Sequence, residues 1–527
     1  MMTHKLLIAD GLGAEGIARL KDLGGLEILE FKDIPRAELE KMLGPVHILV
    51  VRSRTQVDTA LLDKGTSLKL VIRAGIGLDN VDVAAATDRG VVVMNAPTGN
   101  IVTTAEHTLA LLFAATRHVP QADAALRAGK WEKKKFQGNE LRGKKLGIVG
   151  LGNIGKAVAE RAAGLRMEIV GFDPYLSAEA AAKHGVRLAP FDELLAICDY
   201  VTVHVPLTAA THHLIGREAL AKMKKGAYLI NCARGGIVDE TALVEALESG
   251  HLAAAALDVF ETEPLPADHP LLKRGDVVLT PHLGASTDEA QVQVGLEVAE
   301  QVTQYLRDGA LKNAVNVPNV TAEQLMVMKP FLSLCERLGA FASQISETQS
   351  LKGIRIRYEG SLEGCDPAIL TLSILKGVLT PMLSTPVNFV NVRKLVKERG
   401  LRVEESFDAD CRDYQTLVEL KLDGTTVSGT IFGKQEARIV KIDDFAIDAV
   451  PSGYLLFTRN VDQPGVIGTM GTLLANQGVN IARMHLGRDE KKREAIALIN
   501  VDSQLDQAGL DALRKAKGML TVKQIHL

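Results

Sequence analysis

The sequence has few aromatic residues: they make up 4% of its 527 residues and include a single tryptophan. Proteins that bind single-stranded nucleic acids stack bases on aromatic side chains, and this composition provides few such platforms. No charge sign dominates either, because 61 basic and 64 acidic residues leave a formal net charge of −3. Since a general nucleic-acid binder needs a basic face, the composition disfavours that class.

Long apolar runs and paired cysteines are also missing. No apolar run approaches the roughly 18 residues that cross a bilayer, and the first ten residues are too short in apolar sequence for a secretory signal. The cysteines lie far apart without a C-x-x-C pair, which argues against a disulfide framework and against a zinc site of thiolates. They are Cys198, Cys232, Cys335, Cys365 and Cys411. We therefore expect a cytoplasmic protein without a bound metal.

The length predicts several domains, at roughly 100–200 residues each. Over the first hundred residues, β-branched runs alternate with helical periodicity, which is typical of a parallel α/β sheet. The predicted strands there are residues 5–9, 47–52, 69–74 and 91–95. A long apolar helix over 101–118 then carries the chain away from this first sheet.

A second α/β run begins at Lys144 and predicts a doubly wound dinucleotide-binding domain. Its predicted strands are residues 145–149, 167–172, 200–205, 227–231, 254–259 and 277–280. A helix over 287–307 leads to a break in periodicity near residue 318. We expect a nucleotide-binding domain at 98–299, inserted into a first domain made of 1–97 and 300–318, with a cleft between them.

The remaining chain predicts two more domains. Residues 319–452 show two helices (326–345 and 368–379) and then alternating strands with glycine turns, an α+β layout without a chemical motif. Residues 453–527 show the order strand, helix, strand, strand, helix, strand of a ferredoxin-like βαββαβ module.

A glycine-rich turn follows the strand 145–149 and predicts the cofactor. Its sequence is Gly150-Leu151-Gly152-Asn153-Ile154-Gly155. Glycines at this spacing let the backbone N–H groups of a helix N-terminus approach a pyrophosphate. Asp173, at the end of the next strand, is placed to bind both hydroxyls of the adenosine ribose and to repel a 2′-phosphate, so NAD is favoured over NADP.

Three polar residues at or just beyond the ends of late strands are candidate catalytic groups. They are Arg234, Glu263 and His282. A hydroxy-acid dehydrogenase needs a group that moves a proton, a group that tunes it and a cation for the carboxylate. Taken singly, each has a structural alternative: a cation beside a glycine turn, a solvated loop acid and a satisfied histidine. Their occurrence together after a dinucleotide fingerprint favours catalysis.

The fingerprint and three further runs together resemble the D-2-hydroxyacid dehydrogenase family, and most closely its long D-3-phosphoglycerate dehydrogenase branch. The runs are residues 231–236 (NCARGG), 258–264 (DVFETEP) and 281–287 (PHLGAST). The resemblance covers the whole chain. It implies two Rossmann-like domains, an α+β intervening domain and a C-terminal ACT domain. It also implies NAD-dependent oxidation of 3-phospho-D-glycerate to 3-phosphooxypyruvate, the first step of L-serine biosynthesis.

The resemblance assigns roles to the three candidates. It makes His282 the general acid/base, Glu263 its orienting partner and Arg234 the anchor of the substrate carboxylate and carbonyl. It also makes Arg234 and His282 neighbours of the cofactor and directs Asp258 at the nicotinamide carboxamide. The other implied cofactor contacts are Gly150, Gly152, Asn153, Ile154, Gly155, Asp173, Val205, Cys232, Ala233, Gly284 and Ala285. His204, by contrast, lacks an acid motif and is interpreted as part of the core or the cofactor wall.

The same resemblance places substrate contacts in the first domain. They are Ser53, Arg54, Arg73, Gly75 and Asn100. Arginines and backbone amides at strand ends suit a carboxylate and a phosphate. Lys133, in the basic run 131–135, is a further candidate that would close over the phosphate, against the alternative of an ordinary surface charge run.

The C-terminal module resembles an ACT domain, a sensor of small molecules. In paired modules of this kind an Asp and an Asn bind an amino acid across the interface, which makes Asp462 and Asn480 contacts for an L-serine effector. The alternative is a dimerisation module without a ligand. The resemblance also implies a homo-oligomer, expected to be a tetramer.

Two competing functions stay open at this point. Within enzymes, the same site would serve another D-2-hydroxy acid or the reduction of 2-oxoglutarate. Outside enzymes, a dinucleotide fold with a sensor tail would suit an NAD-sensing regulatory protein. That class predicts a helix-turn-helix with a basic face, which the sequence does not suggest.

Overall fold

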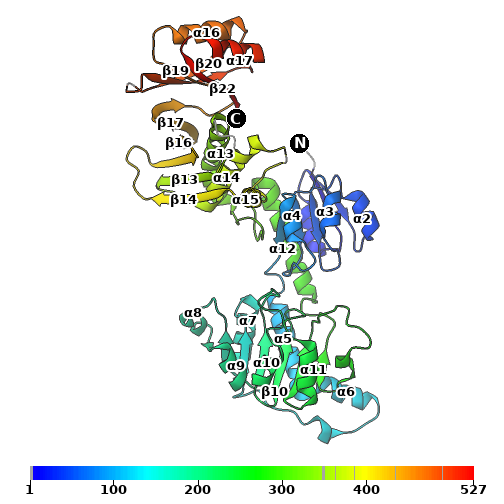
Figure 1. Cartoon of the computed structure of the whole chain (residues 1–527). Helices are drawn as coiled ribbons and strands as arrows, with labels where there is room; N and C mark the ends of the chain where they lie inside the picture. Colours follow the sequence, from blue (N-terminus) through cyan, green and yellow to red (C-terminus); the bar gives the residue numbers. More distant parts are fainter. Residues whose placement is uncertain (1–3, 347–350, 363, 385, 434, 490) are drawn as a thin grey trace.

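The computed structural model describes residues 4–527 apart from 347–350, 363, 385, 434 and 490. The strands of these described residues form four sheets, one after another along the chain. The four units stand in a row, with the C-terminal unit at one end and the second unit at the other (Figure 1). This arrangement confirms the predicted fold class, while the residue limits of the domains remain predictions.

The first unit is a parallel five-stranded sheet in the order β2-β1-β3-β4-β5. Its strands are β1 (His4–Ile8), β2 (Leu26–Glu30), β3 (Ile48–Val51), β4 (Leu70–Arg73) and β5 (Val92–Asn95). Its helices are α1 (Ala14–Lys21), α2 (Arg36–Met42), α3 (Thr59–Lys64) and α4 (Val83–Asp88). A later helix, α12 (Asp288–Asp308), returns to this unit, and its Val298 packs with Leu6 and Ile8. The two helices touch through glycines, since a Cβ at Gly16 of α1 would lie 2.4 Å from the Gly295 carbonyl oxygen.

The second unit is a parallel seven-stranded sheet in the order β12-β11-β10-β9-β6-β7-β8. Its strands are β6 (Lys145–Val149), β7 (Glu168–Phe172), β8 (Arg187–Leu188), β9 (Tyr200–Val203), β10 (Ala227–Asn231), β11 (Leu252–Leu257) and β12 (Val277–Leu279). Its helices are α7 (Asn153–Gly164), α8 (Ala178–Ala182), α9 (Phe191–Ile197), α10 (Arg217–Lys222), α11 (Glu240–Glu248) and η2 (Pro270–Lys273). The order of the strands reverses between β6 and β9, which is where doubly wound sheets bind ligands.

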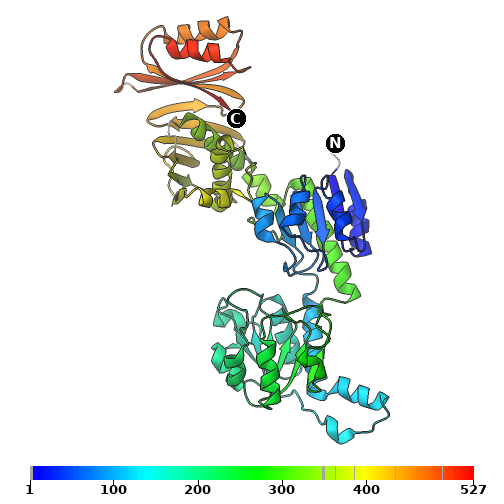
Figure 2. The same cartoon turned by 45° about the vertical axis from the view of Figure 1, so that its right-hand side comes forward.

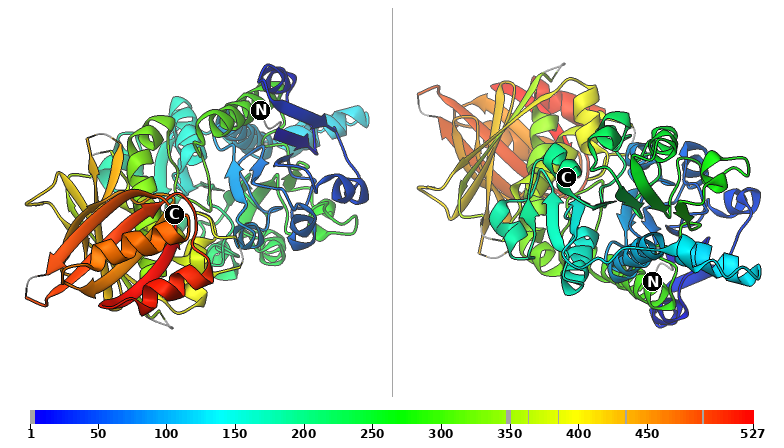
Figure 3. Two further views of the ribbon diagram at one scale, coloured as in Figure 1. Left: turned by 90° about the horizontal axis from the view of Figure 1, so that it is seen from above. Right: turned by 90° about the horizontal axis from the view of Figure 1, so that it is seen from below.

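Two chain segments connect these units. The first is α5 (Ile101–Arg117), and the second is α12. At His118 the backbone turns left-handed, with φ of 52°, so the predicted helix ends there and a new one begins. This is α6 (Val119–Arg127), which with η1 (Lys133–Phe136) forms an arm that projects from the second unit (Figures 2 and 3).

The third unit is a six-stranded sheet in the order β14-β13-β15-β16-β17-β18. Its strands are β13 (Gly353–Gly360), β14 (Arg402–Asp408), β15 (Thr416–Leu422), β16 (Thr425–Phe432), β17 (Glu436–Ile442) and β18 (Phe445–Ala449). Its helices are α13 (Ala322–Ile345), α14 (Pro367–Leu379), η3 (Thr380–Met382) and α15 (Val392–Glu398). The unit docks on the first through Asn388, which donates to the Gly90 carbonyl at 3.0 Å, and through Val390, which joins the first unit's core.

The fourth unit is a four-stranded sheet in the order β20-β21-β19-β22, with two helices on one face. Its elements are β19 (Tyr454–Val461), α16 (Val466–Asn476), β20 (Ile481–Asp489), β21 (Glu494–Val501), α17 (Gln507–Lys515) and β22 (Met519–His526). This is the βαββαβ module predicted from the sequence. It packs closely on the third unit, because a Cβ at Gly487 would lie 2.7 Å from the Ala446 carbonyl oxygen.

Within the described part of the chain, every helix is too short or too polar to span a bilayer.

Candidate active site

A cavity of about 660 Å³ lies between the first and second units. It is lined by the β4–α4 loop of the first unit, by the start of α5 and by the carboxyl ends of the second sheet. Its volume falls in the range of small-molecule sites. The predicted residues that line it are Arg73, Asn100, Gly152, Asn153, Ile154, Val205, Cys232, Ala233, Arg234, Asp258, His282, Gly284 and Ala285.

The glycine turn between β6 and α7 presents bare backbone to this cavity. Gly150 adopts a φ of +95°, a left-handed conformation that favours glycine. At Gly155 a Cβ would lie 2.1 Å from the Gly150 carbonyl oxygen, so the turn closes only without a side chain there. Gly152 caps α7 and has open space where a Cβ would be. The N-terminus of α7 is therefore accessible to an anion, as a pyrophosphate requires.

Asp173 follows β7 and lies beside this turn, though it does not line the cavity itself. Its Oδ2 accepts the N–H of Leu151 at 2.9 Å, and its Oδ1 accepts the N–H of Tyr175 at 2.9 Å. The carboxylate is thus anchored to the backbone of the turn on which a dinucleotide would rest.

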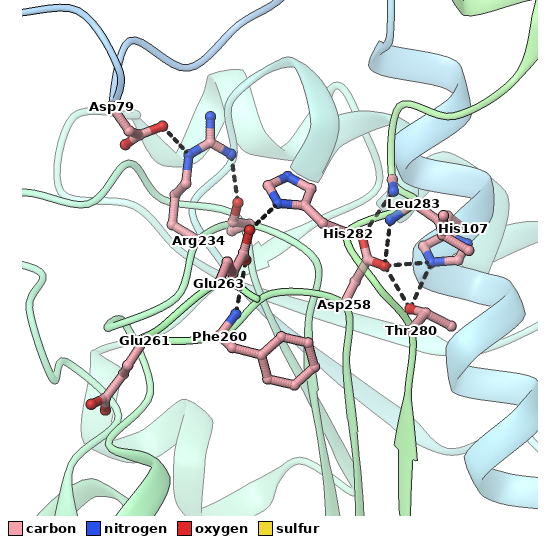
Figure 4. A network of polar contacts seen from close by, with 12 residues as sticks. Asp79, His107, Arg234, Asp258, Phe260, Glu261, Glu263, Thr280, His282 and Leu283 are labelled. Atoms are coloured by element: carbon pink, nitrogen blue, oxygen red, sulfur yellow. Dashed lines mark hydrogen bonds and ion pairs between the residues drawn. The ribbon is translucent and has the colours of Figure 1, made fainter. Parts of the chain in front are cut away.

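His282 and Glu263 form a hydrogen-bonded pair at the cavity (Figure 4). The distance between His282 Nδ1 and Glu263 Oε2 is 2.7 Å, and Glu263 Oε1 accepts the Phe260 N–H at 3.0 Å. Burial alone would raise the pKa of Glu263, but these two hydrogen bonds hold that pKa below its usual value. With Nδ1 engaged, Nε2 is the ring nitrogen available to a molecule in the cavity.

Arg234 spans the cleft between the two units (Figure 4). Its Nε donates to Asp79 of the first unit at 2.9 Å, and its Nη1 donates to the Ala233 carbonyl at 2.6 Å. A Cβ at Gly77 would lie 1.8 Å from Arg234 Nη2, so this guanidinium rests on the glycine loop after β4. Asp79 was not predicted, because nothing in its local sequence indicates a partner 155 residues away.

Asp258 is fully buried and accepts four hydrogen bonds (Figure 4). Its donors are the Leu283 N–H at 2.7 Å, the Gly284 N–H at 2.8 Å, Thr280 Oγ1 at 2.5 Å and His107 Nε2 at 3.1 Å. Burial opposes ionisation, yet these donors keep the pKa of Asp258 below its usual value. His107 and Thr280 were not predicted as site residues. The signal that could have identified His107 is the presence of a histidine on the apolar helix α5, one turn after Thr104.

Several polar atoms at the cavity are buried and have no hydrogen-bond partner among the residues that the structure describes. They are Arg73 Nε, Asn100 Oδ1 and His204 Nδ1. Burial, followed by the charge of Arg234, lowers the pKa of Arg73 to about 10. Because unpaired buried groups are costly, these atoms fit a polar ligand: the guanidinium of Arg73 suits an anion, and the amide oxygen of Asn100 suits a hydrogen-bond donor.

Two reactive-looking groups on the cavity wall are kept neutral. Burial lowers the pKa of His204 to about 4 and raises the pKa of the Cys232 thiol to about 12. His204 Nε2 lies 3.0 Å from Thr202 Oγ1. Neither group has the environment of an acid/base or a nucleophile at neutral pH.

Four predicted substrate residues lie outside the cavity lining. Ser53 and Arg54 are exposed, and Arg54 forms an ion pair with Asp33. Lys133 is exposed on the arm. Gly75 supports Arg73, since a Cβ there would lie 1.7 Å from Arg73 Nη1.

The predicted effector residues lie in the fourth unit and already have partners. Asp462 Oδ2 accepts two hydrogen bonds from Arg488, at 2.9 and 2.6 Å. Asn480 donates to Asp502 at 2.9 Å. Elsewhere, the described residues contain no group of three His, Cys, Asp or Glu side chains arranged to hold a metal ion.

Family models match three stretches of the chain. Residues 109–284 match the D-isomer specific 2-hydroxyacid dehydrogenase NAD binding domain. Residues 327–443 match the D-3-phosphoglycerate dehydrogenase intervening domain, and residues 454–518 match the ACT domain.

Curated relatives match over nearly the whole chain. The D-3-phosphoglycerate dehydrogenase of Archaeoglobus fulgidus is 41% identical over 99% of this chain and 100% of its own length. That of Bacillus subtilis is 41% identical over 99% of both.

Solved structures match the first two units. A glyoxylate reductase from Paecilomyes thermophila is 33% identical with a TM-score of 0.55, covering 60% of this chain and 99% of that one. An NAD-dependent formate dehydrogenase from Staphylococcus aureus in complex with NAD is 29% identical with a TM-score of 0.54, covering 60% and 100%.

Proposed function

Since this chain belongs to the D-3-phosphoglycerate dehydrogenase family, we propose that it oxidises 3-phospho-D-glycerate to 3-phosphooxypyruvate with NAD, the first step of L-serine biosynthesis. The observation that carries the proposal is the pair formed by His282 and Glu263 at 2.7 Å, on a cavity that Arg234 also lines. An NAD-sensing regulator has no need of such a proton-transfer pair.

The protein's own residues divide the work of the oxidation. When bound, NAD supplies the acceptor for the hydride that leaves C2 of the substrate. His282 Nε2 takes the proton of the C2 hydroxyl, and the Glu263 carboxylate stabilises the imidazolium that results. C2 thereby loses its hydride and the hydroxyl oxygen loses its proton, which converts the alcohol into the ketone. Arg234 binds the carboxylate of the substrate, next to the carbon that is oxidised.

Arg73 is the candidate for binding the phosphate group. Its buried Nε has no partner among the described residues, and Arg73 lies at the end of β4 on the first unit's side of the cavity. A dianion would satisfy this guanidinium. Arg54 and Lys133, which lie outside the cavity lining, keep their predicted phosphate roles as parts of the proposal.

We propose that NAD binds with its pyrophosphate on the N-terminus of α7 and its adenosine ribose at Asp173. Asn153 and Ile154 line the cavity at the start of α7 and offer the backbone N–H groups. Val205, Cys232 and Ala233 also line the cavity. The carboxylate of Asp173 would select NAD by repelling the 2′-phosphate of NADP.

We propose that the ACT module binds L-serine through Asp462 and Asn480 across a pair of modules. The ion pair between Arg488 and Asp462 would have to open for the ligand to enter. Serine titration by calorimetry tests this, and the absence of heat would leave a dimerisation module.

A homo-oligomer, expected to be a tetramer, is supported by the exposed apolar side chains of the arm. Trp131 is 84% exposed, and Val119 and Leu126 are more than half exposed. Patches of this kind mark interaction surfaces. The free cysteines among the described residues support a reducing, cytoplasmic setting.

The experiment that tests the function measures NADH formation with 3-phospho-D-glycerate, D-glycerate and D-lactate, and NADH consumption with 2-oxoglutarate. We expect kcat/KM to be highest for the phosphorylated acid. Arg73→Ala should reduce kcat/KM for that substrate by about 10–100-fold, from the worth of a charged hydrogen bond, and affect D-glycerate less. If kcat/KM for 3-phospho-D-glycerate is unchanged in both Arg73→Ala and Arg54→Ala, the assignment of these arginines to the phosphate is refuted. Tight NAD binding without turnover would favour the sensor.

A further inference from the structure

The loop that carries Glu263 is fastened to the first residue of α11. The Glu261 N–H donates to Glu240 Oε1 at 2.7 Å, and the Glu240 N–H donates to Glu261 Oε1 at 3.2 Å. Glu261 points away from His282, whereas Glu263 points toward it (Figure 4). In this loop the carboxylate of Glu263 therefore serves the cavity, and the carboxylate of Glu261 attaches the loop to α11.

Glu240 is buried, with 7% of its surface exposed, and neither it nor Glu261 lines the cavity. Its Oε2 lies 3.2 Å from His269 Nε2, and His269 Nδ1 accepts the Leu271 N–H at 3.3 Å. Because Nδ1 is an acceptor, Nε2 carries the proton and donates to Glu240. Burial, and then the charge of Glu261, raises the pKa of Glu240 above its usual value. Both oxygens of this carboxylate are committed to holding structure.

The Glu263 loop also touches the loop that carries Arg234. A Cβ at Gly235 would lie 1.7 Å from the Phe260 carbonyl oxygen, so the two backbones are in direct contact. A shift of residues 260–263 would thus disturb both Glu263 and Arg234. His213 adds a further restraint, with its Nε2 3.0 Å from Glu261 Oε1.

We propose that Glu240 is a positioning residue for the dehydrogenase reaction: by holding residues 260–263 against α11, it sets the hydrogen bond between Glu263 and His282. This rests on the proposed function. Glu240 acts on the reaction through Glu263 and contacts neither substrate nor cofactor.

The test is Glu240→Gln in the full-length protein. The new amide still offers an oxygen to the Glu261 N–H, but its NH2 group then faces the N–H of His269, so one contact is lost. We expect kcat/KM for 3-phospho-D-glycerate to fall about 10–100-fold, the scale of a small misplacement of a reacting group. The pH profile should shift in the direction that Glu263→Gln shifts it, and the Kd for NAD should stay within about twofold.

The matched control is Glu248→Gln, at the exposed end of the same helix, where the carboxylate pairs with Arg274. It should leave kcat/KM and the pH profile unchanged. In the double variant Glu240→Gln/Glu263→Gln, the loss should be little greater than in Glu263→Gln alone, because both changes disable one unit. Multiplied losses would overturn the proposal, as would an unchanged kcat/KM in folded Glu240→Gln.

Two further measurements test the positioning role of Glu240, the first of them even if Glu240→Gln does not fold. If Glu240→Gln does not fold, His213→Ala removes the other side-chain contact of Glu261 and should shift the pH profile the same way, to a lesser degree; an unmoved profile refutes the role. Hydrogen exchange at the Glu261 amide should accelerate in Glu240→Gln and not in Glu248→Gln. A wild-type protein without activity would refute the proposed function, whereas unaltered exchange would refute the positioning role alone.

Discussion

The hydrogen bond between Glu263 and His282 is the smallest feature on which the chemistry depends. It occupies Nδ1, so that the other ring nitrogen faces the cavity, and it places a negative charge beside the imidazolium that forms during oxidation. Both residues were predicted from the sequence, because the runs that contain them are specific. Asp79 and His107 were not, because their roles arise only when distant segments meet at Arg234 and Asp258.

At this scale, Glu263→Gln should lower kcat/KM and change its pH profile. The reason is that the amide lacks the negative charge that stabilises the imidazolium formed when His282 takes the proton. The profile is measured by NADH formation at saturating NAD. If kcat/KM and its pH profile both stay as in the wild type, Glu263 does not act on His282.

His204 predicts a pH dependence of stability. Its folded-state pKa of about 4 lies below the ordinary 6.5, so the unfolded chain binds more protons between these values. Stability should therefore fall as the pH drops from 6.5 toward 4, by up to about 3 kcal/mol from this group. The melting temperature of His204→Asn should decline less over that range than that of the wild type. Parallel declines would contradict the assignment.

At the scale of elements, the turn between β6 and α7 shows why local patterns were predictable. The strand, the glycines and the helix are adjacent in sequence, and the sterics of Gly150 and Gly155 are set within six residues. Elements with weaker local patterns were missed, among them the two-residue strand β8 and the strands β13 and β14. The helix α13 begins four residues before its predicted start, because Thr321 and Gln324 form a capping box.

Substitutions in the same turn should distinguish effects on NAD affinity from effects on stability. Gly152→Ala places its Cβ in open space, so the melting temperature should hold while the Kd for NAD rises at least about tenfold, because the pyrophosphate needs that space. Gly155→Ala should lower the melting temperature as well, since its Cβ meets the Gly150 carbonyl oxygen. Gly164→Ala, at the other end of α7 and also in open space, is the control for both measurements. If the Kd for NAD is unaltered in Gly152→Ala, the pyrophosphate does not bind at this turn.

At the scale of the whole molecule, the row of four units links the cavity to the C-terminal module. The third unit docks on the first through Asn388 and Val390, and Lys523 of the fourth unit donates to carbonyls at the end of α13. The succession of four folds was predictable from changes in periodicity. The docking was not, because Asn388 and Val390 carry no pattern that distinguishes them from loop residues.

Val390→Asp should loosen this docking, because it places a charge in the core of the first unit. We expect amide exchange in β5 to accelerate by about tenfold or more, with the Kd for NAD unchanged. Lys394→Ala, which removes only an exposed ion pair with Asp88 at the same contact, should have little effect. Equal exchange in wild type and Val390→Asp would show that the contact does not hold the two units together.

In the proposed mechanism, His282, supported by Glu263, moves the proton in an NAD-dependent oxidation of 3-phospho-D-glycerate. The most direct measurement is the rate of NADH formation in a single turnover by the wild type and by His282→Asn, with the NAD affinity of both measured by calorimetry. We expect rapid NADH formation by the wild type, a rate about 10²–10⁴-fold lower in the variant, and equal affinities for NAD. An undiminished rate in His282→Asn, or no NADH from the wild type, would contradict this mechanism.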